Sequence, residues 1–172
     1  MPQKTKADLF QFAFASVEAE YKDLSETWKQ LDTKAQANTA IAGIFLAAAF
    51  TFVRNANPPL TSGLRWLLLL TVIALVASIV LALLAMLVRT VPSLPPSEQA
   101  ANMVTEILEM PETELDDRYD GLVSDTVNAW LPVNRELQAA NSQKADWLAR
   151  SQWSLMVAGA LIACTTVTAL FG

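Results

Sequence analysis

The chain has 172 residues, of which 53% are hydrophobic and 17% are charged, and its net charge is −5. The lack of histidine excludes Ser-His catalytic triads, histidine proton shuttles and most zinc sites. An acidic chain is not attracted to phosphate backbones or anionic lipid surfaces, so no nucleic acid partner is expected, and apolar segments would have to provide any attachment to a membrane.

Residues 1–34 are predicted to form a helix that continues into the first apolar segment. Apolar residues recur there with alternating spacings of four and three: Phe10, Phe14, Val17, Tyr21, Leu24, Trp28, Leu31 and Ala35. The same spacing continues through Asn38, Ala42 and Phe45. This spacing is typical of a heptad seam with charged residues on the other faces. We therefore expect a single helix over residues 7–53, about 70 Å long.

Three uncharged segments are predicted to cross a membrane: residues 35–53, 66–88 and 153–171. The second contains nine Leu, two Ile and four Val, which together favour insertion by about 5–9 kcal/mol. The other two are diluted by alanine, threonine and glycine, so their insertion is favoured by only about 2–4 kcal/mol. These two spans are expected to depend on contacts with neighbouring helices.

Each span carries a face of small residues that are four positions apart. These faces are Thr39-Gly43-Ala47, Ala74-Ser78-Ala82 and Ala160-Cys164-Thr168. Such faces allow close helix packing, but alanine-rich spans also contain these spacings by chance, so both interpretations stay open. The only cysteine, Cys164, has no partner for an internal disulfide and is expected to be a packing residue.

Lysine and arginine are distributed unevenly between the spans. Five precede the first span, two lie in residues 54–65, and five lie in residues 89–152. Positive residues favour the cytoplasmic side of a membrane. The N-terminus and residues 89–152 are therefore predicted to be cytoplasmic, residues 54–65 to form a short external loop, and the chain to end outside.

Residues 89–152 are predicted to contain further helices. The helix of the second span is expected to stop at a proline cluster, Pro92, Pro95 and Pro96. Apolar spacings then predict one helix over residues 100–110 and another over residues 115–130, which ends before Pro132.

From Val133 a last helix is expected to run unbroken into the third span. One face of this helix carries Leu137, Ala140, Lys144, Trp147 and Ser151. Lys144 interrupts the apolar face and is expected to pair with an acidic residue of the N-terminal helix. The predicted fold is an all-α integral membrane protein, with three transmembrane helices and a cytoplasmic helical bundle.

An acidic run invites a calcium-site interpretation: Glu112, Glu114, Asp116, Asp117 and Asp120. An EF-hand loop would need carboxylates where Arg118 and Val127 stand, so a solvated helix face is favoured and no metal site is expected. The five glycines are isolated and form no phosphate-binding loop. The sequence therefore predicts no enzyme and no cofactor.

A small anionic ligand remains possible on the cytoplasmic side. The inner loop offers four bases, Arg118, Arg135, Lys144 and Arg150, and three aromatic side chains for stacking, Tyr119, Trp130 and Trp147. In the structural alternative the bases pair with acids and the aromatic side chains are core. Both alternatives stay open.

At residues 31–43 the sequence LDTKAQANTAIAG resembles the transmembrane effectors of the Pycsar anti-phage system, the PycTM family. That family has an Asp-x-Lys-Ala signature at the start of its first span, here Asp32, Lys34 and Ala35, followed by small residues and a glycine, here Gly43. The hairpin of the first two spans, the long inner loop and the segment KADWLARSQWSLMVAGAL (residues 144–161) are also similar. The resemblance covers most of the chain in its layout.

The resemblance implies a toxic effector in the bacterial inner membrane. In Pycsar systems a cyclase makes cyclic CMP or cyclic UMP during phage infection; the effector responds and impairs the membrane, so that infected cells stop growing. Carried over to this sequence, the signature marks Asp32 and Lys34 as ligand-binding or signalling residues. Arg135 and Lys144, two bases of the inner loop, are further candidates for this role. The structural alternative is a snorkelling lysine at the membrane boundary, paired with or capped by the aspartate.

The exposed heptad seam and the small-residue faces favour a homo-oligomer. Two other functions remain open. The chain could be an effector of a related defence system that uses a different nucleotide messenger, or a non-toxic membrane adaptor that recruits a partner through its cytoplasmic helices. An adjacent gene for a pyrimidine cyclase would favour the Pycsar effector over both of these functions.

Overall fold

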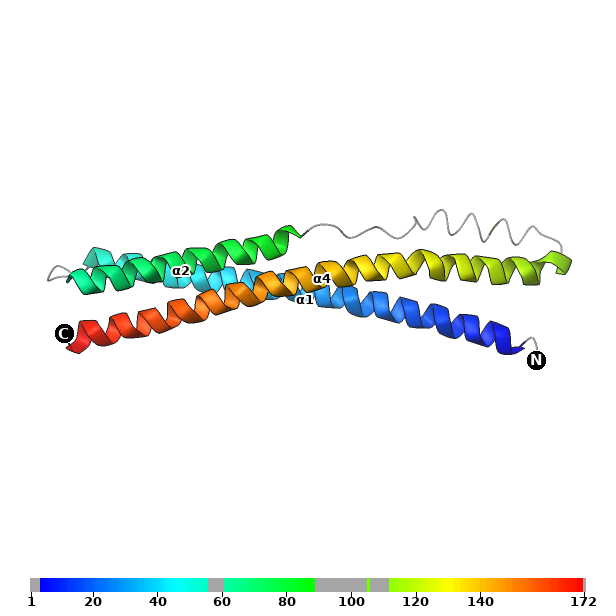
Figure 1. The fold of residues 1–172 in the computed structure, drawn as a ribbon, viewed down its shortest axis with the longest axis horizontal. Helices are drawn as coiled ribbons and strands as arrows, with labels where there is room; N and C mark the ends of the chain where they lie inside the picture. Colours follow the sequence, from blue (N-terminus) through cyan, green and yellow to red (C-terminus); the bar gives the residue numbers. More distant parts are fainter. Residues whose placement is uncertain (1–3, 56–60, 89–104, 106–111, 172) are drawn as a thin grey trace. The chain divides into compact units, whose positions relative to one another are not determined.

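The computed structural model describes residues 4–55, 61–88, 105 and 112–171, and these residues form three long helices, α1 (Lys4–Asn55), α2 (Ser62–Leu87) and α4 (Glu112–Phe171) (Figure 1). Each helix contains a stretch that is long and apolar enough to cross a membrane: Gln11–Asn55, Ser62–Leu87 and Ser124–Phe171. The described part of the chain is therefore helical, with three helices that could each span a membrane. The prediction of one helix over residues 7–53 is confirmed by α1.

The chain divides into two compact units, each containing part of α1 and part of α4. The first unit comprises residues 1–27 and 90–141, and the second comprises residues 28–89 and 142–172. The predicted short helix over residues 100–110 lies outside the described residues except for Thr105. Residues 56–60 of the predicted external loop also lie outside the described residues.

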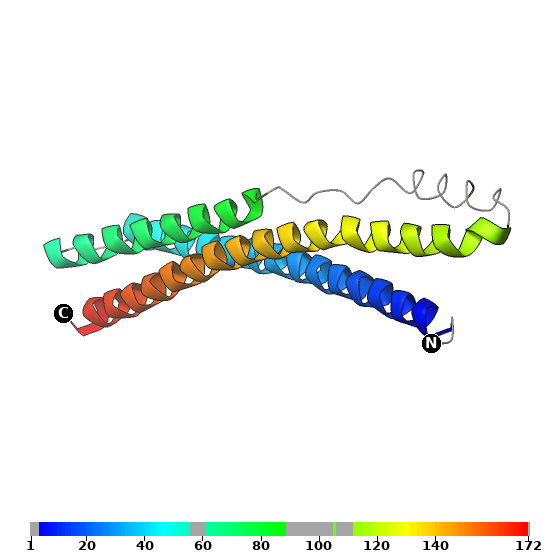
Figure 2. The same ribbon diagram turned by 45° about the vertical axis from the view of Figure 1, so that its right-hand side comes forward.

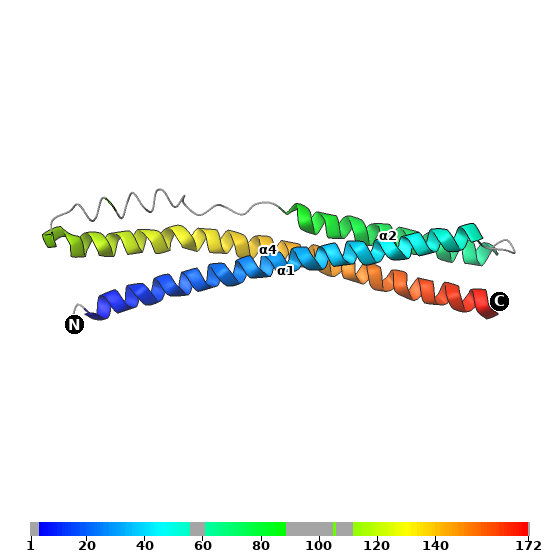
Figure 3. The same cartoon turned by 180° about the vertical axis from the view of Figure 1, so that it is seen from behind.

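In the second unit, α2 packs against residues 28–55 of α1 and residues 142–171 of α4. These two segments run parallel to each other and antiparallel to α2 (Figures 1 and 3). Small side chains fill the centre in two clusters: Ala35, Ala82, Ala85 and Leu148 form one, and Ala42, Leu75 and Ala158 form the other. Because alanine side chains are short, the helix backbones approach closely there.

Of the three predicted small-residue faces, only the α2 face lies at an interface within one chain, where Ser78 and Ala82 are fully buried. On α1 the buried positions are instead Ala35, Asn38, Ala42 and Ala49, which continue the heptad seam. A side chain added at Gly43 would meet nothing within 4 Å. Cys164 is exposed on α4, so its role as a packing residue stays a prediction.

In the first unit, residues 4–27 of α1 run parallel to residues 112–141 of α4 (Figure 2). Trp130 makes edge-to-face contacts with Phe14 and Tyr21, at ring-centroid distances of 6.0 and 5.3 Å. Four aliphatic side chains are buried beside them: Val17, Val133, Leu137 and Ala140. The predicted seam of the N-terminal helix therefore packs against α4.

The expectation that a helix ends before Pro132 is wrong, because α4 continues through this residue. Proline inside a helix removes one backbone hydrogen bond and costs about 3 kcal/mol. Here Trp130 packs against α1 on one side of the proline, and Val133 and Asn134 are buried on the other. Burial of apolar side chains contributes about 1.5–3 kcal/mol each, which is enough to hold the helix together across Pro132.

Replacing Pro132 by alanine should raise the free energy of unfolding by about 2 kcal/mol, because α4 regains a backbone N–H donor. The measurement is an SDS titration of the protein in dodecylmaltoside micelles, followed by far-ultraviolet circular dichroism. Ala139→Pro, at an exposed position of the same helix, is the matched control and should lower the stability. If the free energy of unfolding of Pro132→Ala were equal to or below that of the unaltered protein, α4 would depend on its proline.

Candidate functional site

The most deeply buried charge among the described residues is Lys144 of α4, which lies in the second unit and is only 1% exposed. Its ammonium donates a hydrogen bond of 2.7 Å to Oδ1 of Asp32 on α1. The same nitrogen lies 3.3 Å from the centroid of the Trp28 ring. Three side chains from two helices therefore form one site, which we call the Lys144 site.

The periodicity of the two helices explains why these residues meet. Trp28 and Asp32 are four residues apart, so they lie one above the other on the same face of α1. Lys144 lies seven residues after Leu137 and four before Leu148, both of which are buried on α4. Since α1 and α4 run parallel in this unit, the seam of α4 brings the lysine onto that face of α1.

The Lys144 site compensates for the removal of an ammonium group from water. A buried charge is tolerated only when it is paired and hydrogen-bonded. Asp32 supplies the opposite charge, and the Trp28 ring supplies a cation–π contact worth about 2 kcal/mol when desolvated. One third of the Asp32 side chain is exposed, at 33%, so water reaches the site from the carboxylate side.

This arrangement can hold α1 and α4 together through an ion pair between the two helices. A second anion that competed for the ammonium would weaken the attachment of Asp32, because this carboxylate is the lysine's one ion-pair partner among the described residues. The chemistry of the site is therefore that of an electrostatic contact between two helices.

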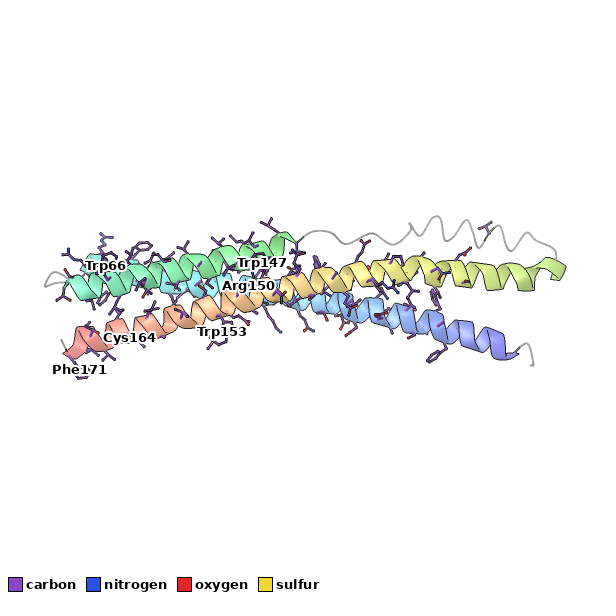
Figure 4. The ribbon with its side chains drawn as sticks, viewed as in Figure 1. Trp66, Trp147, Arg150, Trp153, Cys164 and Phe171 are labelled. Carbon is purple, nitrogen blue, oxygen red and sulfur yellow. The ribbon has the colours of Figure 1, made fainter. Side chains whose placement is uncertain are left out.

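Next to this site, Trp147 packs beside the buried cluster of Ala35, Ala82, Ala85 and Leu148. The guanidinium carbon of Arg150 lies 5.0 Å from the centroid of the Trp147 ring. Figure 4 shows both side chains close together on α4, with Trp153 farther along the same helix. Arg150 itself is exposed on α4.

A buried polar junction joins all three helices of the second unit. The hydroxyl of Ser78 donates to the carbonyl of Ser151, at 3.0 Å, and the hydroxyl of Ser151 donates to the carbonyl of Ser78, at 2.9 Å. Nδ2 of Asn38 donates to Oγ of Ser151, at 3.3 Å. These reciprocal bonds require α2 and α4 to lie almost in backbone contact. In hydrocarbon, interhelical bonds of this kind average about 0.6 kcal/mol and reach about 2 kcal/mol.

In the first unit, two asparagines fix the register of the parallel helices. Nδ2 of Asn134 donates to the carbonyl of Val17 at 3.1 Å and to Oε2 of Glu20 at 3.1 Å. Nδ2 of Asn141 donates to the carbonyl of Leu24, at 2.8 Å. Both the donors and the carbonyls are seven residues apart, as polar residues of a heptad seam would be. Oδ1 of each asparagine is buried and finds no donor within the described part of the chain.

The four predicted site residues fall into two groups. Asp32 and Lys144 form the buried pair, which confirms that Lys144 pairs with an acid of the N-terminal helix. Lys34 and Arg135 are exposed, and neither forms an ion pair with any other described residue. The structure therefore brings together only two of the four.

The sequence analysis missed Trp28, Asn38 and the two asparagines of α4 as polar contacts. Trp28 and Asn38 could have been identified from their position, because they stand on the same heptad seam as the apolar residues of the N-terminal helix. A polar residue on such a seam is expected to meet a partner across the interface.

No group of three potential metal ligands occurs among the residues that the structure describes. The acidic run, Glu112, Glu114, Asp116, Asp117 and Asp120, lies in the first turns of α4. Its side chains lie outside the described part, as do those of Arg118 and Tyr119. That the run is a solvated helix face without a metal site stays a prediction.

Comparison with known proteins gives one match. The PycTM family, described as the Pycsar effector protein domain, matches residues 17–171. No curated protein and no solved structure matches the chain. The matched region begins on α1 at Val17 and includes α2, the Lys144 site, the polar junction and all of α4. The chain therefore belongs to the PycTM family of Pycsar effector proteins.

Proposed function

We propose that this chain is the membrane effector of a Pycsar system, which responds to cyclic CMP or cyclic UMP and impairs the bacterial inner membrane. The observation that carries the proposal is the family match, because it covers all three apolar helices together with most of the polar part of the chain. A domain of this kind needs no catalysis to be toxic. We propose that it acts as a binding and membrane protein, not as an enzyme.

The proposed orientation places the N-terminus and residues 89–152 in the cytoplasm. In the second unit, Lys29, Lys34 and Arg150 are exposed on the segments that precede the first and third spans. Only Arg54 and Arg65 stand at the opposite ends of the first two spans. This distribution supports the orientation because positive residues are retained on the cytoplasmic side.

We propose that the Lys144 site transmits the response. α1 and α4 are unbroken helices that contain both polar residues and membrane spans. Asp32 lies on α1 just before its span, and Lys144 lies on α4 just before the other. A nucleotide that repacks these helices at their polar ends would change the contact between α1 and α4 at this site. Lys34 and Arg135 are exposed bases that a cyclic phosphate could contact.

We also propose that the effector acts as a homo-oligomer. The small-residue faces Thr39-Gly43-Ala47 and Ala160-Cys164-Thr168 are not used within one chain, since Ala47, Ala160 and Cys164 are exposed. Small residues on a lipid-facing surface allow a second span to approach closely. The exposed small-residue faces therefore support self-association through α1 and α4, in an unspecified number of copies.

Cells that contain this protein should lose membrane potential when a pyrimidine cyclase is induced, because the nucleotide would then repack the effector. The measurement is the fluorescence of a potential-sensitive dye together with growth, and a catalytically inactive cyclase is the control. Lys144→Met should abolish the response, whereas Lys29→Met, at an exposed lysine of α1, should retain it.

Unchanged potential and growth in the presence of both cyclic CMP and cyclic UMP would contradict the proposed function. Depolarisation by a purine messenger instead would indicate a related defence system. Harmless overexpression together with recovery of one partner protein by the cytoplasmic helices would indicate an adaptor.

A further inference from the structure

A pocket of about 370 Å³ lies within the second unit, among the membrane-spanning parts of all three helices. Its walls include Ala49 and Phe52 of α1, Leu68 and Thr71 of α2, and Thr165 and Leu170 of α4. These residues belong to the C-terminal parts of α1 and α4 and to the N-terminal part of α2. Figure 4 shows the labelled Cys164 and Phe171 along the same end of α4.

The pocket reflects how the three spans pack. Nearer the Lys144 site the helices are in close contact, and Ala42, Leu75 and Ala158 are completely buried. Farther along, the walls combine larger side chains such as Phe45, Phe52 and Leu68, which leave a space between the helices. An empty space of this size would forfeit dispersion contacts on every wall, so a filled pocket is favoured.

The chemistry of the walls favours an apolar occupant. Three lining threonines already donate their hydroxyl hydrogens to carbonyls of their own helices: Thr71 to Leu67 at 2.8 Å, Thr165 to Leu161 at 2.7 Å and Thr166 to Ile162 at 2.9 Å. The other lining side chains are apolar. A buried water needs two to four polar partners, and these threonines have no hydroxyl hydrogen left to donate to one.

From these observations we infer that the pocket binds an acyl chain of a membrane lipid. The pocket lies within spans that are surrounded by hydrocarbon, so lipid chains are available at high concentration. It is larger than the roughly 150 Å³ cavity that suffices for benzene. None of its lining residues belongs to the small-residue faces Thr39-Gly43-Ala47 and Ala160-Cys164-Thr168, through which a second copy is proposed to pack.

The inference goes beyond the proposed function and requires only that the three helices lie in a bilayer. It predicts that a lipid chain reaches Thr71 and Thr165, which are 1% and 6% exposed. A lipid that stayed outside the helices would instead reach lipid-facing residues such as Ile73 and Val167, which are 55% and 57% exposed. A lipid chain inside the pocket can therefore be distinguished from a lipid outside the helices by the residues that a photoreactive lipid labels.

The experiment uses the full chain in nanodiscs of phosphatidylethanolamine and phosphatidylglycerol, which contain a phospholipid with a diazirine within one acyl chain. After irradiation, peptide mapping by mass spectrometry should find adducts on Thr71 and Thr165 as well as on Ile73 and Val167. Ala49→Phe fills the pocket and should lower the adducts on Thr71 and Thr165 by about fivefold or more, with Val167 unchanged.

Ala163→Phe is the matched control, because Ala163 is exposed on α4 and does not line the pocket. It should leave all adducts unchanged. Ala48→Phe, at a more exposed position of the same wall, keeps the test available should Ala49→Phe not fold. Adducts confined to Ile73 and Val167 in the unaltered protein would overturn the inference, as would Thr71 and Thr165 adducts that persist in both filled variants.

Discussion

Replacing Asp32 by asparagine should lower the free energy of unfolding by about 3 kcal/mol, because it leaves the buried ammonium of Lys144 without an opposite charge. Loss of one partner from a buried ion pair costs about 3–5 kcal/mol. The lower end applies here, since one third of the Asp32 side chain is exposed and water can replace part of the lost interaction. The cation–π contact with Trp28 remains in the variant.

A double-mutant cycle separates the pair from its surroundings. Lys144→Met should cost less than Asp32→Asn, because the carboxylate left behind is partly hydrated. The double variant Asp32→Asn/Lys144→Met should regain most of the stability, since it contains no unpaired buried charge. SDS titration in micelles measures all three variants. Asp23→Asn, at an exposed position of α1, should change the stability by no more than about 0.5 kcal/mol.

Equal stabilities of Asp32→Asn and Asp23→Asn would contradict the buried pair. The double variant also tests the proposed role in the response. If the pair only stabilises the fold, the double variant should regain nucleotide-dependent depolarisation together with stability. If the pair transmits the response, stability should return without depolarisation.

The periodicity of the sequence was sufficient to predict α1 and the partner helix of Lys144. Residues 4–55 contain no proline and a single glycine, Gly43, so nothing interrupts the heptad seam. A seam fixes which residues face a neighbour. The prediction that Lys144 meets an acid of the N-terminal helix followed from this alone.

The partner residue itself could not be predicted, because a seam does not fix the register of two helices. Asp32 meets Lys144 only in the parallel register that Asn134 and Asn141 also satisfy. Those asparagines stand on the seam of α4, where sequence analysis considered mainly apolar residues. The prediction that a helix ends before Pro132 failed for a related reason. The local cost of a proline inside a helix can be estimated from the sequence, whereas the burial of the residues on either side of Pro132 depends on tertiary packing.

Small-residue spacing was a weaker guide within the spans. It marked Ser78 and Ala82 correctly but also marked Gly43 and Cys164, which do not pack within the chain. The spacing of small residues shows where two helices can approach each other closely. The heptad seam determines which of these faces packs within the chain. The contact between Ser78 and Ser151 combines the small-residue face of α2 with the predicted face of α4.

Ser151→Leu should lower the free energy of unfolding by about 3 kcal/mol or more, because Ser151 is completely buried where α2 and α4 nearly touch. A larger side chain there forces the helices apart, at about 1–3 kcal/mol, and the variant also loses the bonds with Ser78 and Asn38. Ser151→Ala loses only the bonds and should cost about 1–2 kcal/mol. SDS titration in micelles gives both values.

The neighbouring position provides the matched control. Gln152 is exposed on the same helix, so Gln152→Leu adds the same side chain without entering the interface and should change the stability by no more than about 0.5 kcal/mol. If Ser151→Leu and Gln152→Leu were equally stable, α2 and α4 could not be in close contact at Ser78. A large loss for Ser151→Leu, with a small one for Ser151→Ala, would show that close packing outweighs hydrogen bonding in holding these spans together.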